Sequence, residues 1–486
     1  MDRPNILFVL TDQMRSTAMG CAGVEKVYTP NLDSLAAQGT RFTNAISNTP
    51  ACAPARATLF TGLHVLSHEL VNNEKQVKLG TCTFAGGFCD AGYKCGYIGK
   101  WHMDGGARTA FIPPGERRLG FDDYWAVANC THSYMESFYY EDDDPEIKWV
   151  EGYEPIVQTD LALDYLGRKA AEESPFFLTL SWGTPHDPYQ EMPAEYAEKY
   201  RWQDIEYTPN NSPYEPAEVR VAKRKMLAGY YAHVTALDEQ LGRLLRFLDE
   251  RPDPRTPDKK LADTTIVVFA SDHGDMLGSH GQYFKSQPYR ESVGVPLIMR
   301  WPGQIAAGRT SDGPISLVDL MPSLLSLSGA EIPSQAEGED LAPFILGDEA
   351  RAQDSVWINF PVDVKIIHSP PFRGVVTRDH TYAVTREGPW CLFDDKEDPF
   401  QRNNLISWAA RDNAEVVALQ QELQQKVDAW LERTNDPFED GDTVSDRYQP
   451  GHRDGVLPQV ADSEFAIALQ QRRAALGERP TDRPAP

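Results

Sequence analysis

Short apolar segments that suit buried strands alternate with amphipathic helical segments along most of this chain. NILFVL (5–10), FFLTLSWG (176–183) and TTIVVFAS (264–271) lack the alternate polar positions of a half-exposed strand. Such runs are typical of parallel strands that are covered by helices on both faces. Helical patterns near 29–39 and 216–250 lie between them. Because this order repeats over about 330 residues, we predict a doubly wound α/β sheet.

The sequence changes character where this alternation ends. FRGVVTRDHTYAVTRE (372–387) predicts antiparallel strands, and a helical pattern follows near 413–434. We therefore expect a catalytic α/β domain over 1–350 and a small C-terminal α+β subdomain over 351–436. The remainder, 437–486, is rich in Pro, Asp, Gly and Arg, and we expect an irregular tail that wraps the body or a neighbouring subunit of a homo-oligomer.

The chain is strongly acidic, with 47 basic and 72 acidic residues and a formal net charge of -25. Nucleic acids are bound by positive surfaces, so this balance argues against a nucleic-acid partner. The opening run NILFVL is too short for a signal sequence or a membrane span, which predicts a cytoplasmic protein without a membrane partner. The cysteines are scattered without CxxC spacing, so we expect neither a disulfide framework nor a structural zinc site.

Ionisable side chains follow five of the predicted strands, at the points where those strands end. Ligands of open α/β sheets bind beyond the carboxyl ends of the strands, so we expect these side chains to share one site. They are Asp12 with Gln13, Cys52, Lys100 with His102, His186, and Asp272 with His273. The two aspartates and His273 suit a divalent cation, and Gln13 can offer a carbonyl oxygen. The alternative is that Asp12 and Asp272 cap helices.

Cys52 stands at a predicted helix start in the segment TPACAPARATLFTG, residues 49–62. A free cysteine is most often a small buried apolar residue. Against this, a helix N-terminus favours anions, and Arg56 one turn further on adds positive charge. A nucleophilic thiolate is therefore the alternative, and the spacing by itself leaves both open.

CAPARATLFTG resembles the pattern C-x-P-x-R-x-x-L-x-T-G of the type I, formylglycine-dependent sulfatases, which belong to the alkaline phosphatase superfamily. GYKCGYIGKWH (92–102) is similar to the second motif of that family, and SDHGDMLGSHGQYFK (271–285) to its metal- and sulfate-binding segment. With later landmarks, the likeness runs in order over residues 3–405. It implies an alkaline-phosphatase-like sandwich with a large mixed, mostly parallel sheet flanked by helices, and an antiparallel sheet in the C-terminal subdomain.

The resemblance implies that a formylglycine-generating enzyme oxidises Cys52 to formylglycine, and that the protein hydrolyses sulfate monoesters. It also implies one divalent cation, calcium by preference and magnesium or manganese otherwise. The implied metal-binding residues are Asp12, Gln13, residue 52, Asp272 and His273. Gln13 stands where many relatives carry a second aspartate, which leaves its role as a ligand open.

The remaining roles also come from the resemblance. Arg56 and Lys100 would hold the oxidised residue and offset negative charge. Lys285 and His186 would bind the sulfate and steady or protonate the departing oxygen, and His102 would act as the base of the second step. The structural alternatives are an exposed lysine for Lys100 and for Lys285, and a loop histidine that bonds to the backbone for His186.

The sequence constrains the identity of the substrate less than it constrains the reaction. ANCTHSYMESFYY (128–140) is rich in aromatic residues and contains His132, which suits a sugar pocket, although a packed aromatic cluster explains it equally well. His280 is a further candidate for substrate contact. We expect a saccharide, aryl or small alkyl sulfate. The alternatives are a phosphonate monoester or phosphodiester hydrolase with the same site, and a non-catalytic protein that binds sulfated ligands with Cys52 unmodified.

Overall fold

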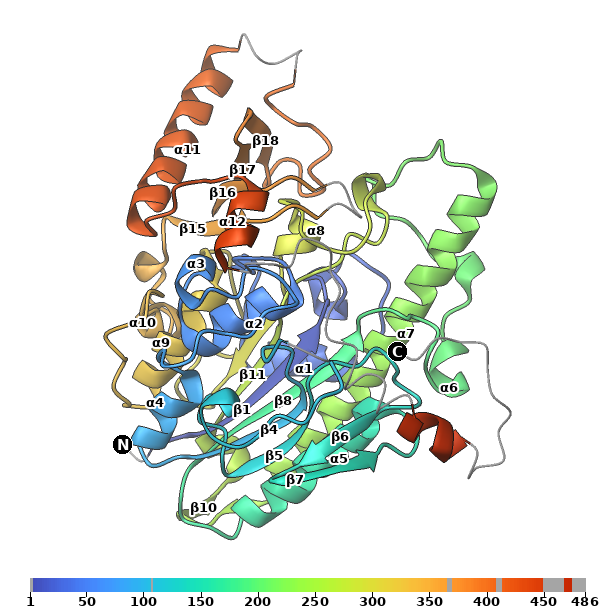
Figure 1. Cartoon of the computed structure of the whole chain (residues 1–486), viewed down its shortest axis with the longest axis vertical. Coiled ribbons are helices and arrows are strands. Elements are labelled where there is room, and N and C mark those ends of the chain that lie inside the picture. The colour runs from blue at the N-terminus through green and yellow to red at the C-terminus, as the bar shows by residue number, and fades with distance from the viewer. Residues whose placement is uncertain (1–2, 106–107, 365–368, 408–412, 449–466, 474–486) are drawn as a thin grey trace.

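The computed structural model of the chain describes residues 3–105, 108–364, 369–407, 413–448 and 467–473. Within these residues the main sheet has ten strands in the order β13-β2-β12-β11-β1-β8-β4-β5-β6-β7 (Figure 1). The strands are β1 (Asn5–Asp12), β2 (Thr40–Phe42), β4 (Lys94–Lys100), β5 (Tyr124–Ala128), β6 (Phe138–Glu141), β7 (Asp144–Trp149), β8 (Phe176–Pro185), β11 (Thr265–Ser271), β12 (Leu297–Arg300) and β13 (Arg309–Ser311). β11, β1, β8, β4 and β5 run parallel, whereas β12, β6 and β7 pair antiparallel. This mixed, mostly parallel sheet confirms the predicted fold class.

Side chains of β1 alternate between two apolar layers, one on each face of the sheet. Ile6, Phe8 and Leu10 pack with α2, α4 and α9, whereas Leu7 and Val9 pack with α1, α5 and α7. The helices are α1 (Pro30–Gln38), α2 (Cys52–Thr61), α4 (Phe84–Asp90), α5 (Glu154–Lys169), α7 (Ala217–Glu250) and α9 (Leu317–Leu327). Burial on both faces explains why the N-terminal strand is apolar throughout.

A second, antiparallel sheet lies at one end of the molecule, at the top of Figure 1. Its strands and covering helices are β15 (Ser355–Phe360), β16 (Phe372–Thr377), β17 (His380–Thr385), β18 (Gly388–Asp394), α11 (Ala414–Arg433) and α12 (Gly441–Tyr448). Trp357 and Tyr382 pack against Val427 of α11, and Val356 on the other face packs in one cluster with Val444 of α12. The sheet is thus covered on both faces, as a small α+β unit requires.

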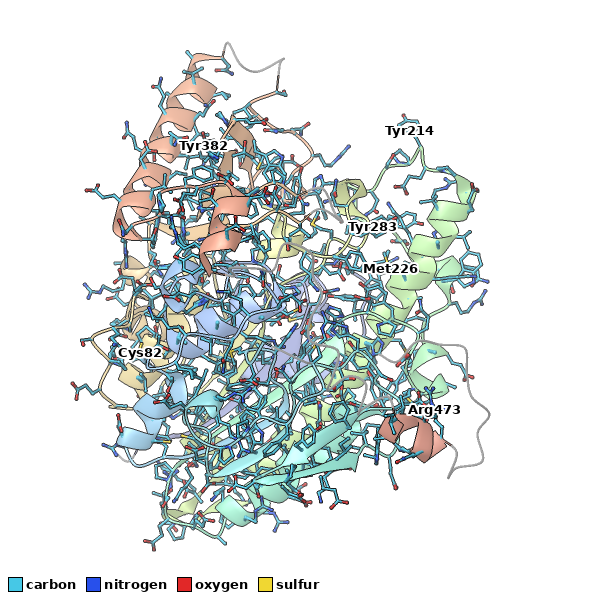
Figure 2. The ribbon with its side chains drawn as sticks, in the orientation of Figure 1. Cys82, Tyr214, Met226, Tyr283, Tyr382 and Arg473 are labelled. Atoms are coloured by element: carbon cyan, nitrogen blue, oxygen red, sulfur yellow. The ribbon has the colours of Figure 1, made fainter. Side chains whose placement is uncertain are left out.

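The C-terminal tail differs from the prediction in its described part. α12 is helical, and so are residues 467–473, whereas 449–466 and 474–486 lie outside the described residues. Leu469 packs with Phe138 and Tyr140 of β6, and Arg473 at the end of this stretch is labelled in Figure 2. Residues 467–473 are mostly good helix formers, and the packing of Leu469 against the body adds to this local preference, which the Pro- and Gly-rich composition of the whole tail conceals.

Short elements connect these layers. They are β3 (Ala45–Ile46), α3 (Val65–His68), α6 (Ala194–Ala197), β9 (Pro252–Asp253), β10 (Thr256–Lys260), α8 (Arg290–Val293), β14 (Ile315–Ser316) and α10 (Ala342–Ile345). Among the described helices none has the length and apolar character needed to cross a membrane. The cysteines all lie in the described ranges and are free, although Sγ of Cys89 lies 3.1 Å from Sγ of Cys95.

Glu154, the first residue of α5, is a buried carboxylic acid. Its Oε1 accepts a hydrogen bond of 2.6 Å from Oγ of Ser137, and its Oε2 has no partner among the described residues. Burial raises the pKa of Glu154 to about 7, against hydrogen bonding to Ser137 and the charge of Lys100, which lower it. The folded protein therefore holds this acid in its protonated form to a higher pH than the unfolded chain does.

This acid predicts a pH-dependent loss of stability. As the pH rises from 4.5 to about 7, the unfolded chain releases the Glu154 proton first, so the contribution of Glu154 to the free energy of unfolding falls by about 3 kcal/mol and changes no further above that window. Chemical denaturation of Glu154→Gln should lack this fall. Glu173→Gln, a change at an exposed position just beyond α5, should behave as the wild type. Equal pH profiles for all three proteins would contradict the assignment.

Candidate active site

Four adjacent strands end at one edge of the main sheet. β1 ends at Asp12 and β4 at Lys100, while β8 ends just before His186 and β11 just before Asp272. The order β11-β1-β8-β4 makes these strands neighbours, and all of them run parallel. Parallel pairing therefore gathers polar groups that are far apart in the sequence.

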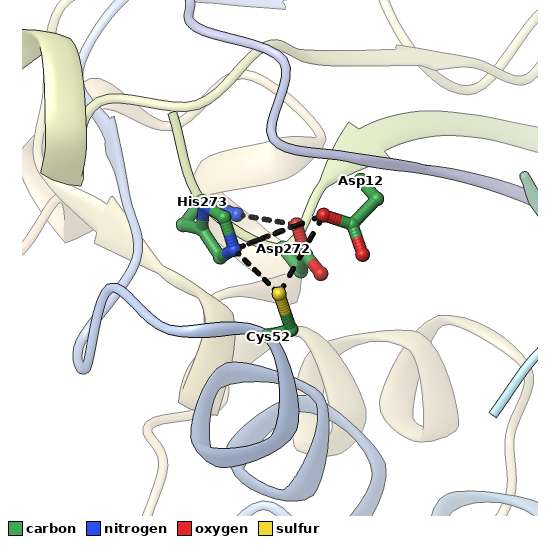
Figure 3. A group of neighbouring side chains, drawn as sticks. All are labelled: Asp12, Cys52, Asp272 and His273. Atoms are coloured by element: carbon green, nitrogen blue, oxygen red, sulfur yellow. Dashed lines mark hydrogen bonds and ion pairs between the residues drawn. The ribbon is translucent and has the colours of Figure 1, made fainter. Parts of the chain in front are cut away.

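Cys52 is the first residue of α2, and its side chain points toward these strand ends (Figure 3). Its Sγ lies 3.2 Å from Nε2 of His273 and 3.7 Å from Oδ1 of Asp12. Ligand atoms of these three residues and Asp272 all lie within 4.8 Å of one another, and all four residues are buried. Burial and Asp12 raise the pKa of the Cys52 thiol, but nearby cations, led by Lys285, outweigh them and lower it overall.

The donor set of this cluster fits a divalent cation. Nδ1 of His273 lies 2.9 Å from the carbonyl oxygen of Gly274, which can only accept a hydrogen bond. Nδ1 therefore carries the proton, and the Nε2 lone pair is directed at the cluster, as in histidines that bind metals. The carboxylates of Asp12 and Asp272 are the hard oxygen donors that such a cation prefers. Sγ of Cys52 occupies the place of the oxygen that formylglycine would present.

Two buried cations balance the two aspartates. Arg56 donates from Nε to Oδ2 of Asp272 at 2.9 Å and from Nη2 to Oδ2 of Asp12 at 3.2 Å. Nζ of Lys100 lies 2.7 Å from the same Asp12 oxygen. Burial raises the pKa of Asp12, but Lys100 and the other nearby cations lower it well below its ordinary value. Asp12 therefore stays a carboxylate whose Oδ1 faces residue 52.

Lys285 and His186 form a second polar pair. Nζ of Lys285 lies 2.8 Å from Nε2 of His186, and Nδ1 of His186 lies 2.8 Å from the carbonyl oxygen of Asp187. Because a carbonyl only accepts, Nδ1 carries the proton and Nε2 accepts from the lysine. Burial, followed by the charge of Lys285, lowers the pKa of His186 well below its ordinary value, so the ring is neutral.

Gln13 lies between the cluster and this pair. Its backbone N donates to Oδ1 of Asp272 at 3.0 Å, and its Nε2 donates to Oδ2 of Asp275 at 2.7 Å. Its Oε1, the atom proposed as a metal ligand, accepts from Nζ of Lys285 at 2.5 Å. The structure thus gives Gln13 a contact that positions Lys285.

Two further predicted histidines lie on the Lys100 side. Both ring nitrogens of His102 are buried and have no hydrogen-bond partner among the described residues. Burial, followed by Lys100, lowers the pKa of His102 well below its ordinary value. His132 stacks on His186 with ring centroids 4.2 Å apart, and its Nε2 lies 3.4 Å from Nζ of Lys100. A neutral His102 with unengaged nitrogens is suited to proton exchange.

His280 is turned toward a different set of neighbours. Its ring stacks on Tyr289 with centroids 4.2 Å apart, and its Nε2 lies 3.1 Å from Nδ2 of Asn210. No contact within the described part of the chain joins it to the Asp12 cluster. Its role in substrate binding stays a prediction.

The C-terminal subdomain supports the segment before Cys52. Thr49 donates from Oγ1 to Oδ1 of Asn359, in β15, at 2.6 Å. Ser369 donates to the carbonyl oxygen of Ser286, the residue that follows the lysine of the polar pair. Strand β15 and the segment before β16 thereby contact the backbone on two sides of the site.

Two supporting side chains were not identified in the sequence. Ser181 accepts from Nη1 of Arg56 at 2.7 Å, and Asp275 accepts from Tyr189 at 2.6 Å as well as from Gln13. Ser181 lies inside the apolar strand β8, where nothing distinguishes it from a core serine. Asp275 was recognisable only as the second acid of SDHGD.

The profile of the family described as Sulfatase matches residues 4–330, more than half of the chain. The chain belongs to the sulfatase family. A second profile, N-sulphoglucosamine sulphohydrolase, C-terminal, matches residues 278–432. The family predicted from the motifs is thereby confirmed.

This sulfatase is 38% identical over 450 residues to the ulvan-active sulfatase of Formosa agariphila, covering 92% of this chain and 84% of that protein. It is 29% identical over 458 residues to the arylsulfatase of Clostridium perfringens, with coverages of 83% and 90%. A solved structure in complex with its substrate D-glucosamine-2-N,6-O-disulfate matches with a TM-score of 0.72 at 25% identity, covering 90% of this chain and 99% of that one. The chain is a sulfuric ester hydrolase.

The cluster predicts cation-dependent stability. After treatment with a chelator, adding calcium at a hundred times its Kd should raise the free energy of unfolding by about 2.7 kcal/mol, because only the folded chain assembles the donors. Asp272→Asn should lose most of this gain in thermal melts, whereas Asp238→Asn, a change at a buried acid of α7, should keep it. A wild type that is indifferent to calcium, magnesium and manganese would contradict the metal site.

Proposed function

We propose that this sulfatase hydrolyses sulfate monoesters of saccharides or aryl alcohols at the cluster around residue 52. The observation that carries the proposal is the position of Cys52. It begins a helix, and its Sγ lies 3.2 Å from Nε2 of His273 and 3.7 Å from the Asp12 oxygen that Lys100 and Arg56 do not use.

Formylglycine at position 52 would supply a hydrated aldehyde. One hydroxyl would attack sulfur and break its bond to the ester oxygen, and loss of the proton from the other hydroxyl would re-form the aldehyde and release the sulfate. Asp12, Asp272 and His273 would hold a divalent cation, which when bound would supply charge to acidify the attacking hydroxyl and polarise a sulfate oxygen. Calcium is our preferred ion, with magnesium and manganese as the alternatives. Because Cys52 is only 1% exposed, the formylglycine-generating enzyme would act before the chain has folded.

Arg56 and Lys100 keep Asp12 ionised, and Arg56 also donates to Asp272, so the two cations hold the groups that surround residue 52. Their charges also offset the negative charge that a bound sulfate brings into a buried site. Their positions support this role of Arg56 and Lys100, since both cations lie within 3.2 Å of the same Asp12 oxygen.

Lys285 and His186 hold the sulfate and assist the leaving group. Nζ of Lys285 donates to Nε2 of the neutral His186, so the pair shares a proton that can pass to the ester oxygen. On the other side of the cluster, His102 takes up the proton that residue 52 loses when sulfate departs. Its unengaged ring nitrogens and its lowered pKa support a base rather than a permanent cation.

Formation of the aldehyde predicts a measurable change at position 52. Mass spectrometry of the peptide 49–62 from active protein should show that sulfur has been lost and oxygen gained. Cys52→Ala should abolish sulfate release, because alanine cannot be converted to the aldehyde whose hydrate attacks sulfur, whereas Cys82→Ala, at a half-buried position, should retain it. A plain thiol in fully active protein would refute the mechanism.

The leaving-group role predicts a substrate-dependent loss. His186→Ala should lower kcat/KM about 10²–10⁴-fold for a saccharide sulfate, whose alkoxide needs a proton, and much less for nitrophenyl sulfate. His380→Ala, a change at a half-buried position of β17, is the control and should leave the ratio between the two substrates unchanged. An equal loss of kcat/KM on both substrates would show that His186 does not assist protonation of the leaving group. Running the same series with an aryl phosphodiester and a phosphonate monoester tests the alternative hydrolase activity.

A further inference from the structure

Two surface loops pair beside the start of α2. The backbone N of Val77 donates to the carbonyl oxygen of Met103 at 2.9 Å. Nε2 of Gln76 donates to Oδ1 of Asp104 at 3.0 Å, in an antiparallel bridge between the same residues. The loop before α4 and the loop after β4 are therefore joined, and β4 is the strand that delivers Lys100.

The first of these loops is also tied to the start of α2. Oδ1 of Asn73 accepts from the backbone N of Ala53, the residue after Cys52, at 3.1 Å. The next residue, Glu74, forms an ion pair with Arg108, with Oε1 and Nη2 3.5 Å apart. Arg108 thus lies beside a segment that is anchored one residue from the reacting position.

Arg108 is tied to the other side of the site as well. Its carbonyl oxygen accepts from the backbone N of Cys130 at 3.0 Å, two residues before His132. Burial is the main cause of the lowered pKa of both His102 and His132, and the charge of Arg108 lowers it further. Burial lowers the pKa of Arg108, but Cys130, Glu74 and Cys52 raise it overall, so the guanidinium stays charged.

Arg108 differs from the other cations of the site in exposure and in pairing. The side chains of Arg56 and Lys100 are 0% and 2% exposed and lie within 3.2 Å of Asp12. The Arg108 side chain is 40% exposed, and its 3.5 Å pair with Glu74 is longer than the roughly 2.7–2.9 Å of a charge-assisted hydrogen bond. An exposed, loosely paired guanidinium can exchange Glu74 for an anion of a ligand, and its fork geometry suits planar carboxylates and sulfates.

We propose that Arg108 is a specificity-determining residue that binds a second anionic group, a carboxylate or a further sulfate, on the saccharide whose sulfate is cleaved at residue 52. This rests on the proposed function, and it narrows the substrate class from sulfate esters in general to acidic or multiply sulfated saccharides. Glu74 fills the subsite when no substrate is bound, and it repels acidic ligands that cannot displace it.

The test compares four kinds of substrate: nitrophenyl sulfate, a neutral monosulfated disaccharide, the same disaccharide with a uronic acid, and a disulfated form. Arg108→Ala should lower kcat/KM about 10- to 100-fold on the uronate, the disulfated form or both, mainly through KM, as expected for a lost charged hydrogen bond. Nitrophenyl sulfate and the neutral disaccharide should change by less than about 2-fold. The pattern across the two acidic substrates tells whether the bound group is a carboxylate or a sulfate.

Two further variants distinguish a loss of anion binding by Arg108 from a general disturbance of the loops around it. Arg117→Ala removes another arginine of the same region, whose Nε donates to Asp104 at 2.7 Å, and should not discriminate between neutral and acidic substrates. Glu74→Gln should improve KM for acidic substrates, the opposite sign to Arg108→Ala. An equal loss on all four substrates in Arg108→Ala, or no loss on the acidic ones, would overturn the proposal.

Calorimetry measures ligand binding directly, so it tests the role of Arg108 even if the protein does not turn over the substrate. If the wild type releases no sulfate from any substrate, the proposed function fails. Binding of the sulfated uronate and of the disulfated saccharide to wild type and Arg108→Ala then still decides the role of Arg108. A Kd that is unchanged by the substitution for both ligands would refute it, and one raised about 10-fold or more would support it.

Discussion

The buried ion cluster around Asp12 is the constraint on which the rest of the site depends. Two carboxylates and two cations are packed within a region that water barely reaches, and each partner satisfies the others. Removing one member leaves an uncompensated buried charge, which costs about 3–5 kcal/mol. Such a cluster holds only if its members arrive from rigid elements, here β1, β4, β11 and α2.

The two carboxylate oxygens of Asp12 have different partners in this ion cluster. Oδ2 is taken by Lys100 and Arg56, whereas Oδ1 faces residue 52 and His273. The cations therefore lower the pKa of the acid without occupying the side that a metal ion would need. The same logic applies to His273, where a backbone carbonyl holds the proton on Nδ1 and leaves Nε2 for the cluster.

The cationic side chains around the site differ in solvent exposure, and their exposure matches their roles. Arg56 and Lys100 are buried and committed to the aspartates, and Lys285 is shared between Gln13 and His186. Arg108, at the rim, is loosely paired and accessible. In a chain of net charge -25, an accessible arginine paired with the loop that anchors the start of α2 gives the acidic protein a local means of attracting an anionic substrate.

The sequence by itself determined the fold class, and it pointed to most of the residues that the structure gathers in the candidate site. Continuous apolar runs required a sheet buried on both faces, and the groups at the strand ends had to meet at one edge. Asp12, Cys52, Lys100 and Asp272 were all found in this way, and the family motifs added Lys285.

Only the tertiary structure decided which atoms face which. Gln13 could serve as a metal ligand, yet its side-chain carbonyl oxygen accepts a hydrogen bond from Lys285. His280 belongs to a sulfatase motif, yet its ring stacks on Tyr289. Ser181 and Arg108 carry no local signal at all, because their neighbours come from distant parts of the chain. Side-chain direction and long-range partners depend on packing between elements, and spacing along the sequence does not encode them.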